Sequence, residues 1–273
     1  MSTSRGPRID FISLIGLPLA IGVIVLAQVL EGGSARALWQ PTAALVVFGG
    51  SSGAVLVSFP FEVTIGTIRA VIGAFRRRKN EIQPAVRRLV AYAMESRRRG
   101  IVSLEPEIEH TPEEFLRNAL TLAVDGTNPR ITRQILEIEN NERRAAAEAP
   151  AEVLETAAGY TPTLGILGAV LGLIHVMGSL SEPALLGSGI AVAFVSTVYG
   201  VGAANLVLLP LAAKLRGHGR EEGRYREVVI EGIIALQDGL NPRLIEQKLQ
   251  SYVTLSRPTT ARVLPGLSGD RIR

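Results

Sequence analysis

The sequence predicts an all-α integral membrane protein with four transmembrane helices and a cytoplasmic helical domain. Four apolar blocks recur along the 273-residue chain, and none of them contains Asp, Glu, Lys or Arg. Each block is about as long as the roughly 20 helical residues that cross a hydrocarbon core of roughly 30 Å. Between the second and third blocks the apolar residues recur instead at the spacing of an amphipathic helix.

The first transmembrane helix is expected at residues 11–30, after a short, polar and basic cytoplasmic N-terminus at residues 1–10. The apolar block is too long for the apolar region of a signal peptide and lacks a small-x-small cleavage site. Pro18 lies inside it, and a membrane helix tolerates a proline kink when its neighbours satisfy the freed carbonyl.

The second transmembrane helix is expected at residues 41–60. Trp39 precedes it, where an indole favours the membrane interface. Its centre, residues 49–54, reads Gly-Gly-Ser-Ser-Gly-Ala, and such small residues would let another backbone approach closely.

Residues 61–156 are expected to form the cytoplasmic helical domain. The segment from Thr111 to Glu114 predicts a helix start. Thr111 would cap the helix, and the carboxylate of Glu114 would accept a hydrogen bond from the backbone N–H of Thr111. The pattern Asp-Gly-x-Asn-Pro-Arg occurs at residues 125–130 and again at 238–243. In both copies glycine can end one helix while Asn-Pro starts the next, so we expect two equivalent helix breaks, with a duplicated domain as the less favoured alternative.

The third and fourth transmembrane helices are expected at residues 160–180 and 189–213. Both carry small residues three and four positions apart, an interval that lies on one helix face. These ladders are Gly165, Ala169 and Gly172 in the third helix, and Gly189, Ala193, Ser196, Thr197, Gly200 and Ala204 in the fourth. Two interpretations remain open: close packing between the two helices, or a passage for an ion lined by the hydroxyls of Ser196 and Thr197.

The distribution of charge predicts the orientation in the membrane. Residues 61–156 hold 15 Lys and Arg, and the tail from Leu211 holds 11 more, whereas the connection at residues 31–40 has only Arg36 and the connection at 181–188 has none. Short loops rich in Lys and Arg stay in the cytoplasm. We therefore expect a multi-pass protein of the bacterial inner membrane with both termini inside, and C-terminal helices and a tail over residues 214–273.

Several classes of function are disfavoured by composition. The chain has no cysteine, its three histidines form no metal-ligand spacing, and no phosphate loop, serine elbow or dinucleotide fingerprint occurs. We therefore expect neither an enzyme nor a protein with a metal or cofactor. The formal net charge is +4, but acidic residues are interleaved with the basic ones, which argues against nucleic-acid binding.

Two long segments, GYTPTLGILGAVLGLIHVM (159–177) and GSGIAVAFVSTVYGVGAANLVLLPLAAKL (187–215), closely resemble the A subunit of the flagellar motor stator, the MotA/PomA family. The stretch LVVFGGSSGAVLVSFP (45–60) is similar as well, with Gly-Gly-Ser where the family usually has Gly-Gly-Thr. The resemblance implies a subunit of an ion channel that couples ion flow to torque on the flagellar rotor during motility.

The resemblance also implies site residues. The matching positions on the ion pathway are Pro162, Ala169, Ser196, Thr197, Tyr199 and Pro210. Sodium-driven relatives have threonine where this chain has Ala169, so a proton is favoured over sodium as the transported ion. The segment ESRRRGIVSLEPEIE (95–109) resembles the family's torque-generating stretch, in which Arg97 and Glu105 would act on the rotor's switch complex; a solvated, charge-laced helix end is the alternative.

No carboxylate lies at the centre of any predicted span: Asp10, Glu31 and Glu182 lie at the ends or in a loop. His175 lies near the periplasmic end, and we expect it to be an interfacial or packed side chain. By the resemblance, the titratable group would be the transmembrane aspartate of a MotB-like B subunit, with several A subunits, five by expectation, forming a ring around a B dimer. The alternatives are an ExbB/TolQ-like energiser of cell-envelope partners and a non-conducting helical membrane scaffold.

Overall fold

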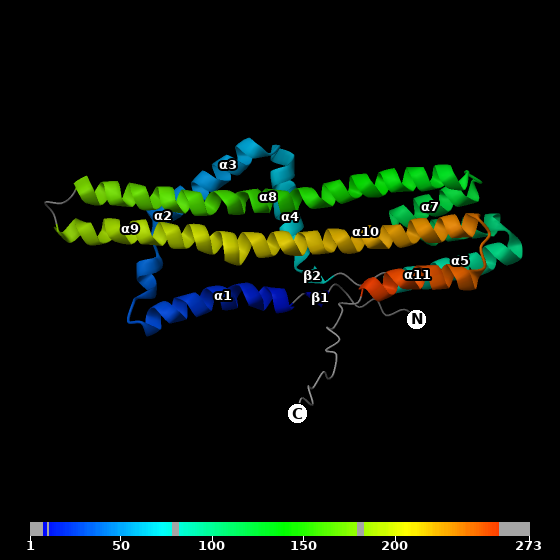
Figure 1. The fold of residues 1–273 in the computed structure, drawn as a ribbon, viewed down its shortest axis with the longest axis horizontal. Helices are drawn as coiled ribbons and strands as arrows, with labels where there is room; N and C mark the ends of the chain where they lie inside the picture. The colour runs from blue at the N-terminus through cyan, green and yellow to red at the C-terminus, as the bar shows by residue number, and fades with distance from the viewer. Residues whose placement is uncertain (1–7, 10, 78–81, 179–182, 257–273) are drawn as a thin grey trace, which may run out of the picture. The chain divides into compact units, whose positions relative to one another are not determined.

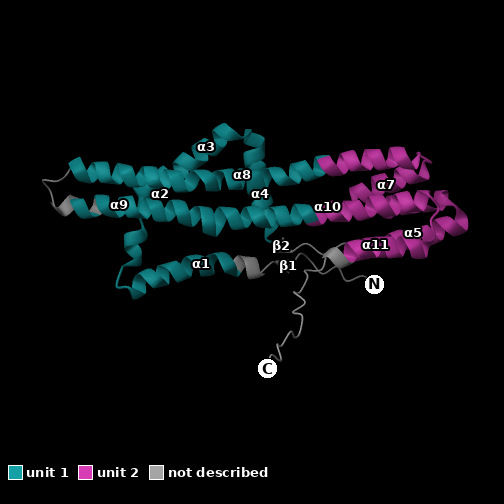
Figure 2. Ribbon diagram, viewed as in Figure 1, with its two compact units in different colours: residues 1–79, 142–220 teal, residues 80–141, 221–273 magenta. Residues whose placement is uncertain are grey.

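The structure, a computed structural model of the chain, describes residues 8–9, 11–77, 82–178 and 183–256 (Figure 1). These residues are almost entirely helical, as predicted for an all-α protein. The chain divides into two compact units (Figure 2). Unit 1 comprises residues 1–79 and 142–220, and unit 2 comprises residues 80–141 and 221–273.

Unit 1 holds the segments predicted to span the membrane. Its first part contains α1 (Phe11–Leu30), η1 (Ala35–Leu38), α2 (Pro41–Ala44), η2 (Leu45–Gly49), α3 (Gly50–Ser58) and α4 (Phe61–Ala74). Two short strands, β1 (Arg8–Ile9) and β2 (Arg76–Arg77), pair antiparallel with Arg8 opposite Arg77. Its second part takes residues from α8 (Pro129–Gly178), α9 (Pro183–Gly202), η4 (Ala203–Leu208) and α10 (Leu209–Gln237).

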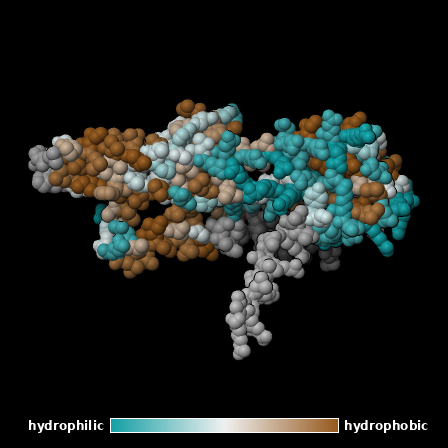
Figure 3. Space-filling view, viewed as in Figure 1, coloured by the Kyte–Doolittle hydropathy of each residue, from teal (hydrophilic) through white to brown (hydrophobic). Residues whose placement is uncertain are grey.

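Three of the four predicted spans lie in described helices that are long and apolar enough to cross a membrane. By length and composition, Ala35–Ser58, Pro129–Gly178 and Gly189–Gln237 could each span a bilayer, and α1 is a 20-residue apolar helix at the first predicted span. Apolar side chains gather on the surface over α1, α8 and α9 (Figure 3). Ile174, Phe194 and Leu19 are each more than half exposed, as expected for side chains that face lipid.

The third and fourth spans are parts of longer helices than the sequence predicted. Instead of starting near residue 160, the third span lies in the 50-residue helix α8, which contains Pro150 and Pro162. The fourth span continues through η4 into α10 without an intervening loop. The expected end of the cytoplasmic segment at residue 156 therefore falls inside a helix, because neither an interior proline nor a change from polar to apolar composition is enough to stop one.

Two of the spans contain a turn of π-helix. In the second span this is η2, and between α9 and α10 it is η4. A π-turn widens the helix and leaves the regular hydrogen-bond ladder, and such turns are frequent at functional sites.

Unit 2 is built around one apolar core. Its elements are α5 (Ile82–Arg99), η3 (Ile101–Leu104), α6 (Glu105–His110), α7 (Glu114–Val124), α11 (Pro242–Ser256) and the ends of α8 and α10. Fully buried core side chains are Leu89, Phe115, Leu120, Leu136, Ile233 and Ile245. Helix α11 packs on α5, so a C-terminal helix lies beside part of the segment 61–156.

Both predicted Asn-Pro helix starts are confirmed. The Oδ1 atom of Asn128 accepts a hydrogen bond from the backbone N–H of Arg130 at 2.9 Å, and Asn241 accepts one from Arg243 at 3.0 Å. The preceding glycines, Gly126 and Gly239, have φ of 72° and 69°, the left-handed conformation that ends a helix at low cost only for glycine.

The predicted cap at Thr111 is wrong. Helix α7 starts at Glu114, and its cap is Glu113, whose carboxylate accepts hydrogen bonds from the N–H groups of Phe115 and Leu116. Thr111 is buried and donates to the carbonyl of Glu107, so it completes the end of α6 instead. A carboxylate one residue before the helix satisfies two N–H groups at once and also favours the positive end of the helix dipole.

A charged cluster joins three helices of unit 2. Glu231 on α10 accepts a hydrogen bond from Arg133 on α8 at 2.7 Å and pairs with Lys248 on α11 at 2.5 Å. The hydrogen bond from Arg133 is the main reason that the pKa of Glu231 lies below its usual value, and Lys248 adds to it. The pKa of Arg133 is raised in turn by Glu231.

Because the folded-state pKa of Glu231 is lowered, its contribution to stability is fully present above the ordinary carboxyl value of about 4.3 and is lost as pH falls through the lowered value. We expect Glu231→Gln to destabilise unit 2 by about 1 kcal/mol at pH 7, and this difference from the wild type to shrink below about pH 4. Thermal unfolding of the purified chain, followed by circular dichroism from pH 7 to pH 3, measures it. Glu246→Gln, at an exposed carboxylate on α11, is the control; a constant gap between Glu231→Gln and wild type would contradict the prediction.

Candidate functional site

Helices α8 and α9 approach each other through glycine. A methyl group added at Gly200 would lie 2.5 Å from the carbonyl oxygen of Thr161 and 3.0 Å from the Cα atom of Gly165. One added at Gly172 would lie 2.9 Å from the backbone nitrogen of Ala193. Separations this short leave no room for a side chain, so the two backbones are in direct contact.

The small-residue face of α9 therefore packs against α8. Gly189, Ala193, Ser196 and Gly200 all belong to this contact, which corresponds to the packing interpretation of the ladder. On α8 the contributing residues are Gly165, Gly168 and Gly172. Gly168 belongs to the contact as well, because a methyl there would lie 2.7 Å from the hydroxyl of Ser196.

The two hydroxyls of α9 lie in different surroundings. Ser196 is fully buried at the contact with α8 and donates to the carbonyl of Val192 at 2.8 Å. Thr197 is half-buried, and among the described residues its hydroxyl has no hydrogen-bond partner. The Cα atom of Thr197 lies 3.4 Å from the methyl position of Gly165, so this hydroxyl stands at the edge of the helix contact.

Pro162 and Ala169 lie two helical turns apart on α8 and are both half-buried. The Cα atom of Pro162 lies 3.1 Å from the methyl position of Gly200. The structure thus brings Pro162, Ser196 and Thr197 to one contact between the helices. Pro210 is exposed at the start of α10, after η4.

Tyr199 makes contacts that the sequence did not indicate. Its hydroxyl donates to the carbonyl oxygen of Leu38 at 2.5 Å and accepts a hydrogen bond from the backbone N–H of Gln40 at 3.3 Å. Its ring stacks on Phe48 of η2, with ring centroids 5.9 Å apart. Tyr199 therefore holds the connection that precedes the second span against α9. It also satisfies the backbone N–H of Gln40, the first residue before α2, whose own side chain makes no cap.

No Asp or Glu lies within residues 160–178 of α8 or within α9. His175 is exposed on α8 near the end of the described helix, so it is not a packed side chain. Asp10 and Glu182, which the sequence placed outside the span centres, lie outside the described residues. Within the described part of the chain, no group of His, Asp and Glu side chains could hold a metal ion.

Arg97 and Glu105 are both exposed in unit 2. Arg97 lies in the last turn of α5 and Glu105 is the first residue of α6, with Gly100 at φ 85° reversing the chain between them. Leu104, directly before Glu105, is fully buried in the core of unit 2. Among the described residues neither Arg97 nor Glu105 has an ion-pair partner, so both charges are available to another molecule.

Sequence reasoning missed one polar group. Ser51 on α3 is 5% exposed, and its hydroxyl oxygen has no hydrogen-bond partner in the described chain. The Gly-Gly-Ser-Ser-Gly pattern showed that small residues surround Ser51, but it did not show which part of the chain packs against them. At Gly50 the neighbour is the side chain of Leu164, 3.1 Å from the methyl position, rather than another backbone.

Comparison with known proteins identifies the family. Residues 14–96 match the family model of the motility protein A N-terminal domain, and residues 107–228 match that of the MotA/TolQ/ExbB proton channel family. Motility protein A of Bacillus subtilis is 35% identical over 89% of this chain and 91% of its own length. The chain belongs to the motility protein A family.

Solved structures of this family share its fold. The A chain in the structure of C. jejuni MotAB aligns with a TM-score of 0.86 and 26% identity over 92% of this chain and 98% of that chain. The chain in the flagellar MotAB stator complex from Bacillus subtilis aligns with a TM-score of 0.81 and 33% identity over 90% of this chain and all of that chain. This confirms the resemblance to the flagellar stator A subunit, and membership of a channel-subunit family confirms that the protein is not an enzyme.

The glycine contact between α8 and α9 gives a sharp test. Gly200→Ala places a methyl against two backbones and should destabilise the membrane unit by about 1–3 kcal/mol. Gly202→Ala, half a turn away on the same helix, meets nothing within 4 Å and should be neutral or stabilise by up to about 1 kcal/mol through helix propensity. Thermal unfolding of the two purified variants in the same detergent compares them, and equal stability would contradict the described packing.

Proposed function

We propose that this protein is the A subunit of a flagellar stator, and that with a B-type partner it forms a proton channel that drives the rotor. The observation that carries the proposal is its place in the motility protein A family, with solved stator complexes as structural neighbours. We further propose that the transported ion is a proton, since Ala169 offers a methyl group where a bound cation would need oxygen ligands.

The lack of a carboxylate in the third and fourth spans supports a partner subunit that supplies one. Residues 160–178 of α8 and residues 183–202 of α9 carry no carboxylate, and proton transfer through a membrane needs a group that can bind and release the proton. The two neighbouring solved structures are those of C. jejuni MotAB and of the flagellar MotAB stator complex from Bacillus subtilis. We therefore propose that a MotB-like subunit supplies a transmembrane aspartate, that five A subunits surround a B dimer, and that both termini are cytoplasmic.

Thr197 is the side chain best suited to line this pathway. It is half-buried beside the closest contact of α8 and α9, and unlike the hydroxyl of Ser196 its hydroxyl has no hydrogen-bond partner among the described residues. A hydroxyl without an internal partner can accept and donate hydrogen bonds to water or to a carboxylate in the pathway. Pro162 and Ala169 would line the same pathway from α8.

We propose that Arg97 and Glu105 act on the rotor. Their exposure and lack of internal partners suit a contact that forms and breaks at each step, because exposed ion pairs contribute only about 0.2–1 kcal/mol each. The burial of Leu104 and Thr111 on either side of α6 holds Glu105 on a rigid support.

The conduction proposal predicts that Thr197→Ala lowers proton flux through the assembled A–B complex by about tenfold, because one polar group of the pathway is lost. Flux is measured in vesicles with a pH-sensitive dye under an imposed potential, with and without sodium. Thr163→Ala, at an exposed threonine of α8 whose hydroxyl bonds only to the carbonyl of Tyr160, is the control. Undiminished flux in Thr197→Ala, or flux that requires sodium, would refute the corresponding part of the proposal.

The torque proposal predicts that Arg97→Glu strongly impairs swimming while membrane insertion and proton flux stay normal. Reversing one charge turns an attraction to an acidic rotor residue into repulsion, whereas Arg97→Lys keeps the charge and should retain most motility. Swimming speed in a motile host that lacks its own A subunit measures the effect. Normal swimming by Arg97→Glu at wild-type protein levels would exclude a torque role for this residue.

A further inference from the structure

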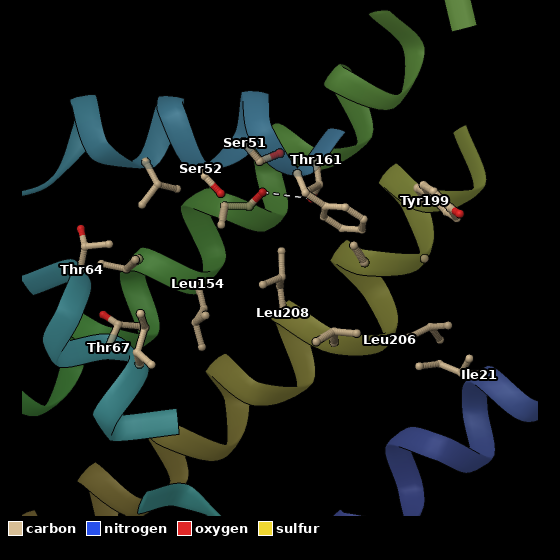
Figure 4. A pocket seen from close by; sticks show the side chains of 18 of the residues that line it. Ile21, Ser51, Ser52, Thr64, Thr67, Leu154, Thr161, Tyr199, Leu206 and Leu208 are labelled. Carbon is tan, nitrogen blue, oxygen red and sulfur yellow. Dashed lines mark hydrogen bonds between the residues drawn. The ribbon is translucent and has the colours of Figure 1, made fainter. Parts of the chain in front are cut away.

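Unit 1 contains a cavity of about 870 Å³ that the proposed stator function does not use. It is bounded by α1, η1, η2, α3, α4, α8, α9 and η4, and its lining is almost wholly apolar (Figure 4). Both π-turns of the spans contribute to its wall, Phe48 from η2 and Leu206 and Leu208 from η4. Its volume is that of a typical ligand pocket.

The cavity is elongated along the second span. Its lining runs from Trp39, directly before that span, to Phe61, directly after it. The intervening helix, residues 41–58, is about 27 Å long at the usual rise per residue. A cavity that follows a span over this length suits a long flexible chain better than a compact molecule.

Polar groups gather toward one end of the cavity. Five hydroxyl-bearing residues line it on α3, α4 and α8, namely Ser51, Ser52, Thr64, Thr67 and Thr161 (Figure 4). The hydroxyls of Thr64, Thr67 and Thr161 already donate to backbone carbonyls. Ser51 is different, because its buried hydroxyl has no partner within the described chain. Because this oxygen is also inaccessible from the cavity, a ligand cannot reach it. The hydroxyl of Ser52 is exposed and also has no partner among the described residues, so it is the one that can donate to a ligand.

A positive charge stands near the same end. Arg69 on α4 is exposed and follows Ile65 by one helical turn, and Ile65 lines the cavity. Among the described residues Arg69 has no ion-pair partner. By the proposed orientation it lies on the cytoplasmic side, where anionic lipid headgroups attract Lys and Arg next to membrane spans.

We propose that this cavity is a binding site for an anionic phospholipid of the cytoplasmic leaflet. An acyl chain occupies the apolar part between α1 and η4, the ester region lies among the hydroxyls and accepts a hydrogen bond from Ser52, and the phosphate lies near Arg69. The apolar lining matches the chain, the unpartnered hydroxyl matches the ester, and the arginine matches the headgroup charge. A second copy of the protein fits less well, because the space is a concave slot between helices of one chain rather than a flat face.

The test uses the full-length protein in its purified assembly, equilibrated with vesicles of equal parts phosphatidylcholine and phosphatidylglycerol. After transfer into detergent and washing, mass spectrometry counts the phospholipid that stays with each chain. We expect the wild type to retain phosphatidylglycerol in preference to phosphatidylcholine. Ala203→Phe, which fills the cavity from η4, should lose the retained lipid, whereas Ala27→Phe, at an exposed position on α1 outside the lining, should retain it.

A second pair of variants tests the headgroup without altering the cavity. Arg69→Gln should lose the preference for phosphatidylglycerol while total retained phospholipid stays unchanged, and Arg36→Gln, at an exposed arginine of η1, should behave as wild type. Equal lipid retention by Ala203→Phe and Ala27→Phe overturns the proposal, as does an unchanged lipid preference in Arg69→Gln. A weakened oligomer with unchanged lipid retention in Ala203→Phe would assign the cavity to a second copy instead.

Discussion

The direct backbone contact between α8 and α9 constrains the rest of the membrane unit. Gly165, Gly172 and Gly200 bring no side chain of their own into the contact, so the helices approach more closely than larger residues would allow. In a lipid environment apolar side chains gain little from leaving the solvent, and close packing together with a few hydrogen bonds must hold the helices together. The same contact positions Ser196 inside the pair and Thr197 at its edge, so packing and the proposed pathway depend on one set of small residues.

Much of the fold could be predicted from the sequence because its signals are local. Uncharged blocks of about 20 residues indicate the spans, and a glycine followed by Asn-Pro indicates a helix end and a new start whatever surrounds them. Both Asn128 and Asn241 cap as expected. Local patterns are less able to choose between two competing caps, and at Thr111 and Glu113 the choice depended on Thr111 being buried beneath α6.

The details of the site depend on pairs of residues far apart in the chain, and no local pattern reveals them. Tyr199 bonds to Leu38, 161 residues away, and its assignment to the pathway by resemblance gave no hint of this contact. The ladder predicted on α8 did not include Gly168, because the intervals of three and four fit Gly168 and Ala169 equally, and only the nearby Ser196 shows that Gly168 lies at the contact. Ser51 was invisible for the same reason, since its lack of a partner follows from what the other helices bring near it.

The continuity of α8 bears on how ion flow could reach the rotor. The helix contributes residues 129–141 to unit 2 and residues 142–178 to unit 1, so Leu136 in the core of unit 2 and Gly165 at the contact with α9 belong to one helix. An unbroken hydrogen-bond ladder transmits rotation and translation along a helix, whereas a proline removes one of its bonds and permits local bending. Pro150 and Pro162 both lie between those two positions. In the proposed mechanism a change at the α8–α9 contact would therefore reach unit 2 as a displacement of α8, with bending concentrated at these two prolines.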